Sequence, residues 1–315
     1  MADLHIDWPE RIAGAQARCR EILSQPDFAA IPGIAAGLGV TPAQLGGLVA
    51  RTARTGLPQE AWEPLAEACE RQGIPGSGHV LERFVLLNAG LANLPHAPGL
   101  PVAEEVKERL LEQVLYVCAP DRDIASLLDA RQHGFQVMCR FMLLTRFPTG
   151  QSDWEVSAFP RSWLAKFPLR DIPRALACVF LRAGGHRPFF ETHTAIRRDS
   201  PMMAEEFERE TFRLMAISMR LQPAIRGHMA ASWLMSPNLA EGSPHLAWQA
   251  AWWQECKDFG AVWTNLGPAP ADAGFLVGDP RRRRLYEAGK WKPLRGVLIW
   301  ARRDLLGWYD SQYGR

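Results

Sequence analysis

Residues 274–308 carry the clearest structural pattern of the chain: GFLVGDPRRRRLYEAGKWKPLRGVLIWARRDLLGW. The glycine and proline at its start predict a loop. A short basic helix is then expected over 281–287, ending in Leu-Tyr-Glu-x-Gly, and an apolar run predicts a strand over 296–301. A helix followed by a strand indicates a domain that contains both elements.

The residues before this stretch continue the alternation. Short apolar runs of strand length predict four further strands, over 176–181, 189–194, 226–234 and 261–266. Longer amphipathic stretches predict helices over 205–221 and 243–259. The proline-rich residues 146–172 are interpreted as a crossing segment. This order of elements is typical of a mixed α/β domain.

The first half of the chain has a different composition and predicts only helices. Ten of the twelve tryptophans lie at or beyond Trp154. Thr41 and Pro42 are typical of a helix start, and Leu45, Leu48 and Val49 follow at the spacing of an amphipathic helix. We therefore expect an α+β protein, with a helical domain over 1–150 and an α/β domain over 151–315.

Composition limits the possible functions. The net charge of +2 gives no general attraction to nucleic acid, and no apolar run approaches the ~20 residues that cross a bilayer. The first residues are acidic and lack the apolar core of a secretory signal. The sequence therefore predicts a cytoplasmic protein that binds no nucleic acid and has no membrane span.

The element order over 175–308 and the segment Leu285-Tyr286-Glu287-Ala288-Gly289 together resemble the closing part of the GCN5-related N-acetyltransferase (GNAT) fold. The resemblance implies transfer of an acyl group from a thioester to an amine. It also implies a coenzyme A thioester as cosubstrate, no tightly bound cofactor, and a small-molecule or peptide amine as acceptor. Direct attack is favoured over a covalent intermediate, since no cysteine lies in a motif.

The resemblance also assigns roles to residues. The strand over 226–233 would hold the thioester arm through its backbone, at Gly227, His228, Met229 and Ala230. Tyr286 would be the acid that protonates the leaving thiolate. Ser232 is a candidate for polarising the thioester carbonyl.

Phosphate binding is the part of the family pattern that this sequence does not repeat. The usual Arg/Gln-x-x-Gly-x-Gly/Ala loop is missing, and SPNLAEGSPHLAW stands there instead. Ser243, at a predicted helix start, is either a phosphate ligand or an ordinary cap. Arg282 and Arg283 either grip a phosphate or form a solvated face. An acyl carrier as donor, or a domain that has lost activity, therefore remain alternatives.

Two polar residues of the predicted strand 189–194 are candidates for the base that removes the proton from the amine. Glu191 and His193 are two apart and so share one face, while Phe190 and Thr192 take the other. A carboxylate beside an imidazole can orient a base or ligate a metal. A strand bordering solvent shows the same alternation.

Three hypotheses follow. The first is an acyltransferase that uses Glu191 or His193 as base. The second is a zinc or non-haem iron enzyme, for which Glu191, His193 and His228 or His245 would have to converge. The third is a non-catalytic binding protein with a degenerate acyltransferase domain.

Overall fold

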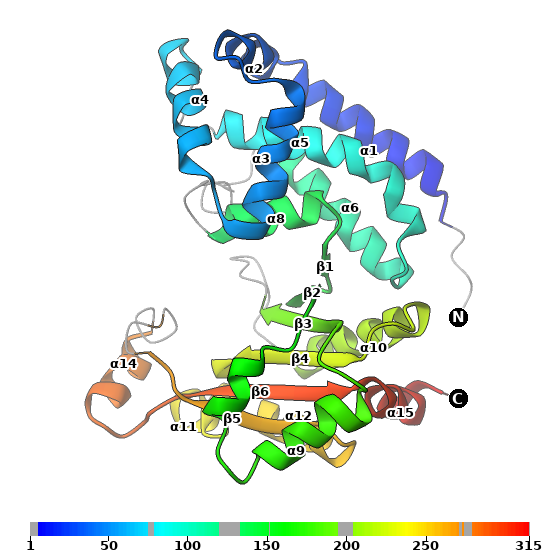
Figure 1. The fold of residues 1–315 in the computed structure, drawn as a ribbon, viewed down its shortest axis with the longest axis vertical. Helices are drawn as coiled ribbons and strands as arrows, with labels where there is room; N and C mark the ends of the chain where they lie inside the picture. The colour runs from blue at the N-terminus through cyan, green and yellow to red at the C-terminus, as the bar shows by residue number, and fades with distance from the viewer. Residues whose placement is uncertain are drawn as a thin grey trace. The chain divides into compact units, whose positions relative to one another are not determined.

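The computed structural model describes residues 6–74, 79–119, 133–150, 152–194, 204–270, 273 and 279–314. The chain divides into two compact units (Figure 1). Unit 1 comprises residues 1–100 and 104–147, and unit 2 comprises residues 101–103 and 148–315. Unit 1 is helical apart from residues 146–147, and the mixed sheet with its other helices belongs to unit 2. The predicted α+β class, with a helical N-terminal region, is confirmed.

Unit 1 is built around α5 (Val80–Asn93), which packs against α1 (Trp8–Leu23), α2 (Pro26–Gly37), α3 (Pro42–Thr55), α6 (Glu104–Cys118) and α8 (His133–Met142). Thr41 begins α3 as predicted, because its hydroxyl accepts from the Gln44 amide at 3.3 Å while the Gln44 side chain accepts from the Thr41 amide at 2.7 Å. The other helices of this unit are α4 (Gln59–Arg71) and η2 (Leu94–Gly99).

The sheet has the strand order β1-β2-β3-β4-β6-β5. Its strands are β1 (Arg146–Pro148), β2 (Ser152–Ser157), β3 (Phe189–Thr194), β4 (Gly227–Ser232), β5 (Val262–Pro268) and β6 (Leu294–Ala301). The pair β3–β4 is parallel, whereas β2–β3, β4–β6 and β6–β5 are antiparallel. The last strand of the chain, β6, therefore lies between β4 and β5 (Figure 1).

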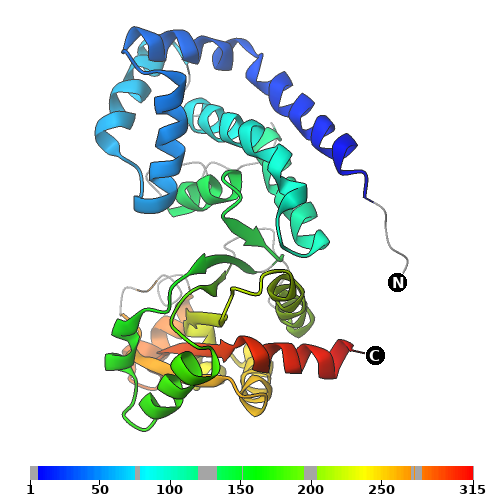
Figure 2. The ribbon, with the colours of Figure 1, turned by 45° about the vertical axis from the view of Figure 1, so that its right-hand side comes forward.

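Both faces of this sheet are covered, which explains the unbroken apolar run of β6. Val297 and Ile299 join one core with Cys178, and Trp300 joins the aromatic side chains around Phe212 on the other side. The helices of unit 2 are η3 (Arg161–Lys166), α9 (Ile172–Leu176), η4 (Ala177–Arg182), α10 (Glu205–Leu221), η5 (Trp233–Met235), α11 (Leu239–Gly242), η6 (Pro244–Leu246), α12 (Trp248–Asp258), α14 (Pro280–Glu287) and α15 (Arg302–Tyr313). The C-terminal helix α15 directly continues β6 (Figure 2).

Most predicted elements of unit 2 are present, with two corrections. The strand predicted over 176–181 is wrong: the segment is helical, as the end of α9 and the π-helix η4. A short apolar run does not distinguish a strand from a buried helix. The helix predicted over 243–259 begins only at Trp248, after the 3₁₀ turn η6.

Among the described residues, no single helix is both long enough and apolar enough to cross a bilayer. One pair, Pro26–Gly37 with Pro42–Thr55, meets that test jointly and is bent by 101°.

Candidate functional site

The parallel strands β3 and β4 are joined along only part of their length. Their recorded register begins with Phe190 opposite His228 and ends with Thr192 opposite Ala230. Each strand continues for two more residues, β3 to Thr194 and β4 to Ser232. Their outer edges stay paired over those residues, β3 with β2 and β4 with β6. Within the described residues, the unjoined edges therefore face each other inside the sheet.

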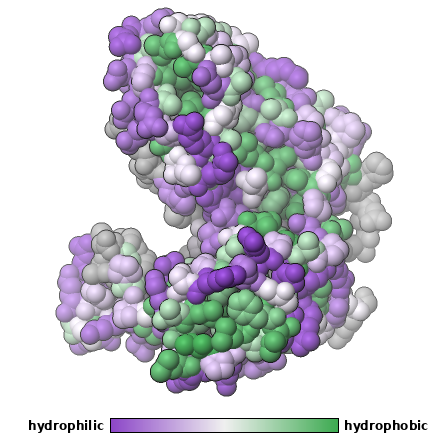
Figure 3. Space-filling view, in the orientation of Figure 1, coloured by the Kyte–Doolittle hydropathy of each residue, from purple (hydrophilic) through white to green (hydrophobic). Residues whose placement is uncertain are grey.

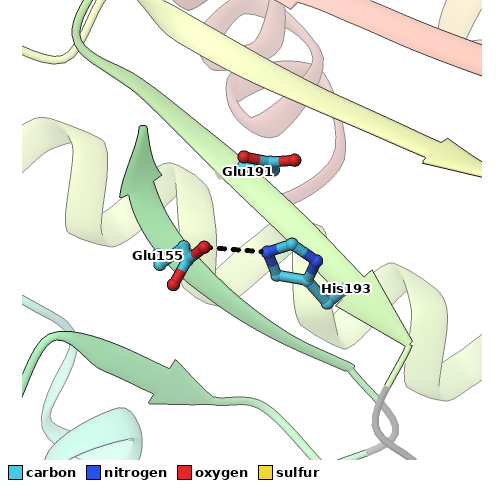
Figure 4. A group of neighbouring side chains, drawn as sticks. All are labelled: Glu155, Glu191 and His193. Atoms are coloured by element: carbon cyan, nitrogen blue, oxygen red, sulfur yellow. Dashed lines mark ion pairs between the residues drawn. The ribbon is translucent and has the colours of Figure 1, made fainter. Parts of the chain in front are cut away.

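A cluster of three ionisable side chains lies on β3 and the neighbouring strand β2. Glu191 and His193 share one face of β3, as predicted, and Glu155 of β2 is the register partner of Glu191. One ligand atom of each of the three lies within 4.8 Å of the others. Figure 4 shows Glu155 and His193 facing each other, with Glu191 beside them. We call these three residues the β2–β3 cluster.

His193 contacts the carboxylate of Glu155, and the two form an ion pair only when the imidazole is protonated. His193 Nε2 lies 3.3 Å from Glu155 Oε1, and the side chains are 30% and 18% exposed. Nε2 itself is buried and has no hydrogen-bond partner among the described residues. The imidazole nitrogen therefore lies next to a carboxylate, an arrangement suited to a base or to a cation ligand.

Glu155 was missed by the sequence argument because β2 was not predicted. Residues 146–172 were interpreted as a crossing segment, although they contain β1 and β2. The sequence does contain an alternating pattern at this strand, in which Asp153, Glu155 and Ser157 alternate with Trp154 and Val156. This period of two is that of a strand with one apolar face.

His228 lies on the opposite face of the sheet. It is fully buried, and its Nε2 lies 2.8 Å from Thr192 Oγ1. Its ring contacts Phe212 edge-on at 5.0 Å, and burial lowers the pKa of its imidazole to about 3. His228 therefore does not converge with Glu191 and His193, as the metal hypothesis would require, because the pleat separates them. His245 is exposed on η6 and is not part of the β2–β3 cluster.

The predicted β4 residues Gly227, Met229 and Ala230 are buried, so only their backbone could contact a ligand. Met229 packs in the apolar core and is fully buried, and Ala230 is 1% exposed. Gly227 is required by packing, since a Cβ there would lie 2.3 Å from the carbonyl oxygen of Trp300. These three positions thus present backbone groups rather than functional side chains.

A shallow hollow of ≈ 280 Å³ lies at the carboxyl end of β4. Its lining includes Ser232, Trp233 and Arg295. The Ser232 hydroxyl accepts from the Leu234 amide at 3.2 Å, and a hydroxyl retains a hydrogen that it can donate. The Arg282 guanidinium stacks on Trp233, 4.7 Å from the ring centre. Two predicted site residues, Ser232 and Arg282, are thereby brought to the same end of β4.

The other predicted residues differ in accessibility. Tyr286 is half-buried on α14, a helix with no buried residue, and Arg283 is exposed on the same helix. Ser243 is 1% exposed, and its hydroxyl has no hydrogen-bond partner in the described part of the chain. Its hydroxyl does not face solvent, so a phosphate could not reach it in this conformation.

Known proteins share this fold without close sequence relationship. No family model and no curated protein matches the sequence. A solved acyltransferase in complex with decanoyl-CoA and teicoplanin has a TM-score of 0.50 at 13% identity, over 90% of this chain and 87% of that one. An acyltransferase mutant in complex with octanoyl-CoA has a TM-score of 0.51 at 13% identity, over 93% and 88%. Since both cover nearly the whole chain, the likeness extends beyond its C-terminal half.

Proposed function

We propose that this protein is an acyltransferase of GNAT type, which moves an acyl group from a coenzyme A thioester to an amine. The observation that carries the proposal is the partly unjoined parallel pair β3–β4. The fold shared with solved acyltransferases supports it. The strand order supports the GNAT type, because the last strand lies between its two predecessors.

The unjoined edges suit an extended ligand that carries amides. The pantetheine arm of coenzyme A has two amide groups, and an extended chain can bind an open strand edge through main-chain hydrogen bonds. Residues 193–194 of β3 and 231–232 of β4 would supply these bonds. An acyl carrier is the alternative donor, since its prosthetic arm is chemically the same.

His193 is the proposed base, because it lies just beyond the last β3–β4 pair, where the thioester would enter. The amine nitrogen bonds to the thioester carbonyl carbon, and the carbon–sulfur bond then breaks. His193 accepts the proton that the amine loses, and Glu155 and Glu191 stabilise the resulting imidazolium. The products are an amide and a free thiol.

The hollow at the end of β4 and the helix α14 carry groups suited to the other charges of the reaction. Ser232 would donate to the carbonyl oxygen as it gains negative charge. Arg282 and Arg283 would bind phosphates of the donor. Tyr286 would protonate the leaving thiolate.

Native mass spectrometry with acetyl-, octanoyl-, decanoyl- and palmitoyl-coenzyme A tests the donor. The solved neighbours hold octanoyl- and decanoyl-CoA, so medium chains are expected to give the strongest adduct. Absence of an adduct with every chain length would contradict the proposal. Teicoplanin, which one neighbour contains, is the first acceptor to try, followed by amino sugars and peptides. Thiol release on addition of the acceptor measures turnover.

Variants of the β2–β3 cluster separate chemistry from binding. His193→Ala should lower turnover on the order of a hundredfold and leave the thioester adduct unchanged. Glu155→Gln, which removes the charge beside the imidazole, should lower it by about tenfold. His245→Ala, at an exposed histidine outside the cluster, is the matched control and should be silent. Full thioester binding without any thiol release would indicate a non-catalytic binding protein.

A metal site in the β2–β3 cluster is the second candidate. The separation of 3.3 Å between His193 Nε2 and Glu155 Oε1 is close to the ~3.3 Å between two ligands of a tetrahedral zinc ion. Chelator competition with Zn²⁺ and Mn²⁺ tests it directly. Tight binding that is lost in both His193→Ala and Glu191→Gln, without any thioester adduct, would put the metal enzyme first.

A further inference from the structure

Apolar side chains are exposed on unit 2 around α9 and η4, far in sequence from the proposed site residues of α14. Leu169 is 85% exposed and Leu181 is 80% exposed, while Leu176 and Phe180 are each 39% exposed. Figure 3 shows a continuous apolar area over this part of the molecule. We call these four residues the α9 surface. Single exposed leucines are ordinary, but a group of this kind indicates an interaction site.

The helical segment explains why Leu176, Phe180 and Leu181 face outward, while Leu169 lies in the turn before α9. Its inner side is fixed by Ala175, Cys178 and Val179, which are fully buried against the sheet. Leu176 and Phe180 are four residues apart and so lie next to each other on the outer side. A helix that is apolar all round normally has a partner on every side. On the outer side, Leu176 and Phe180 remain 39% exposed, and Phe180 is covered in part by a ring contact with His186 at 6.5 Å.

Positive charges predominate around the α9 surface. Residues 161–187 contain six arginines and lysines, at 161, 166, 170, 174, 182 and 187, and a single acid, Asp171. The Asp171 carboxylate already accepts from the Thr264 hydroxyl at 2.8 Å. Arg182 is paired with Asp304 at 2.7 Å, whereas Lys166, Arg170 and Arg174 are exposed and form no ion pair with a described residue. The whole chain has a net charge of only +2, so this is a local concentration of positive charge.

We propose that the α9 surface docks on an anionic membrane, with the helix lying along the interface. The exposed leucines and Phe180 enter the boundary between head groups and acyl chains, and the flanking cations bind lipid phosphates. The segment of five residues in α9 and six in η4 is too short to cross a bilayer but long enough to lie on one. This proposal does not depend on the acyltransferase activity.

Vesicle cosedimentation of the full chain tests the apolar part. Vesicles of phosphatidylcholine with about one third phosphatidylglycerol should bind the protein at least tenfold more tightly than pure phosphatidylcholine. The double variant Leu169→Ser/Leu181→Ser should lose at least tenfold in affinity, because each leucine contributes apolar area. Leu221→Ser is the matched control, at a 52% exposed leucine of α10, and should bind as the wild type does.

Charge reversal tests the electrostatic part. Arg170→Glu/Arg174→Glu should abolish the preference for phosphatidylglycerol and most of the salt dependence of binding. Circular dichroism should show the wild-type fold in every variant, since all changed side chains are exposed. Absence of binding to phosphatidylglycerol vesicles at low salt overturns the proposal. So would a self-association that the double leucine variant abolishes, because the surface would then bind a second copy of the chain.

Discussion

Glu208 is a carboxylic acid in the core of unit 2, on α10, with 5% of its surface exposed. Burial raises the pKa of its carboxyl from 4.5 to about 7. The folded protein therefore keeps a proton that the unfolded chain loses above pH 4.5. The protonated Glu208 carboxyl therefore contributes fully to stability below pH 4.5. The free energy of unfolding then falls by about 3 kcal/mol as the pH rises through 7. Glu208→Gln should remove this loss, as measured by urea unfolding at about pH 5 and about pH 8.

His228 has the opposite dependence. Its pKa is lowered from 6.5 to about 3, so its neutral form stabilises the fold above pH 6.5 and this stability is lost as the pH falls. Between pH 4.5 and 6.5 the slopes of the two residues oppose each other. The wild type should therefore change little in stability over this range, and Glu208→Gln should become acid-sensitive. His228→Gln should instead lose stability as the pH rises, and parallel curves for all three proteins would contradict both assignments.

Gly227 illustrates how one strand position fixes the packing of the sheet. The Cβ of Gly227→Ala would lie 2.3 Å from the Trp300 carbonyl oxygen and 2.9 Å from the Phe189 ring. Backbone cannot move aside cheaply, so we expect a loss of about 1–3 kcal/mol in the free energy of unfolding. Gly307→Ala on α15 is the control and should raise the free energy of unfolding, because nothing lies within 4 Å of its Cβ. Alanine in a helix should stabilise it by about 0.5–1 kcal/mol, and urea unfolding of both variants checks the pair.

The elements that were predicted and those that were missed differ in how local their signals are. The helix over 205–221 and the strand over 189–194 have the predicted bounds, because each shows its own period and ends at a change of pattern. The segment 176–181 carries apolar residues on all sides, and only its place against the sheet determines that it is helical. Pairing across strands is equally invisible to a local pattern. Glu191 and His193 could be aligned from one strand, whereas Glu155 required the neighbouring strand and its register.

At the scale of the whole chain, each unit has its own apolar core. One core is formed by residues from Ala15 to Leu144, and the other by residues from Phe159 to Ala301. We therefore expect the domains predicted over 1–150 and 151–315 to unfold in separate transitions. Tryptophan fluorescence should follow mainly the second domain, which holds ten of the twelve tryptophans, while far-ultraviolet circular dichroism follows the helices of both. Two urea curves with different midpoints are the expected result. Coincident curves would indicate one cooperative unit. The variant Trp62→Phe removes a buried tryptophan of the first core, so any fluorescence change that it abolishes comes from the first domain.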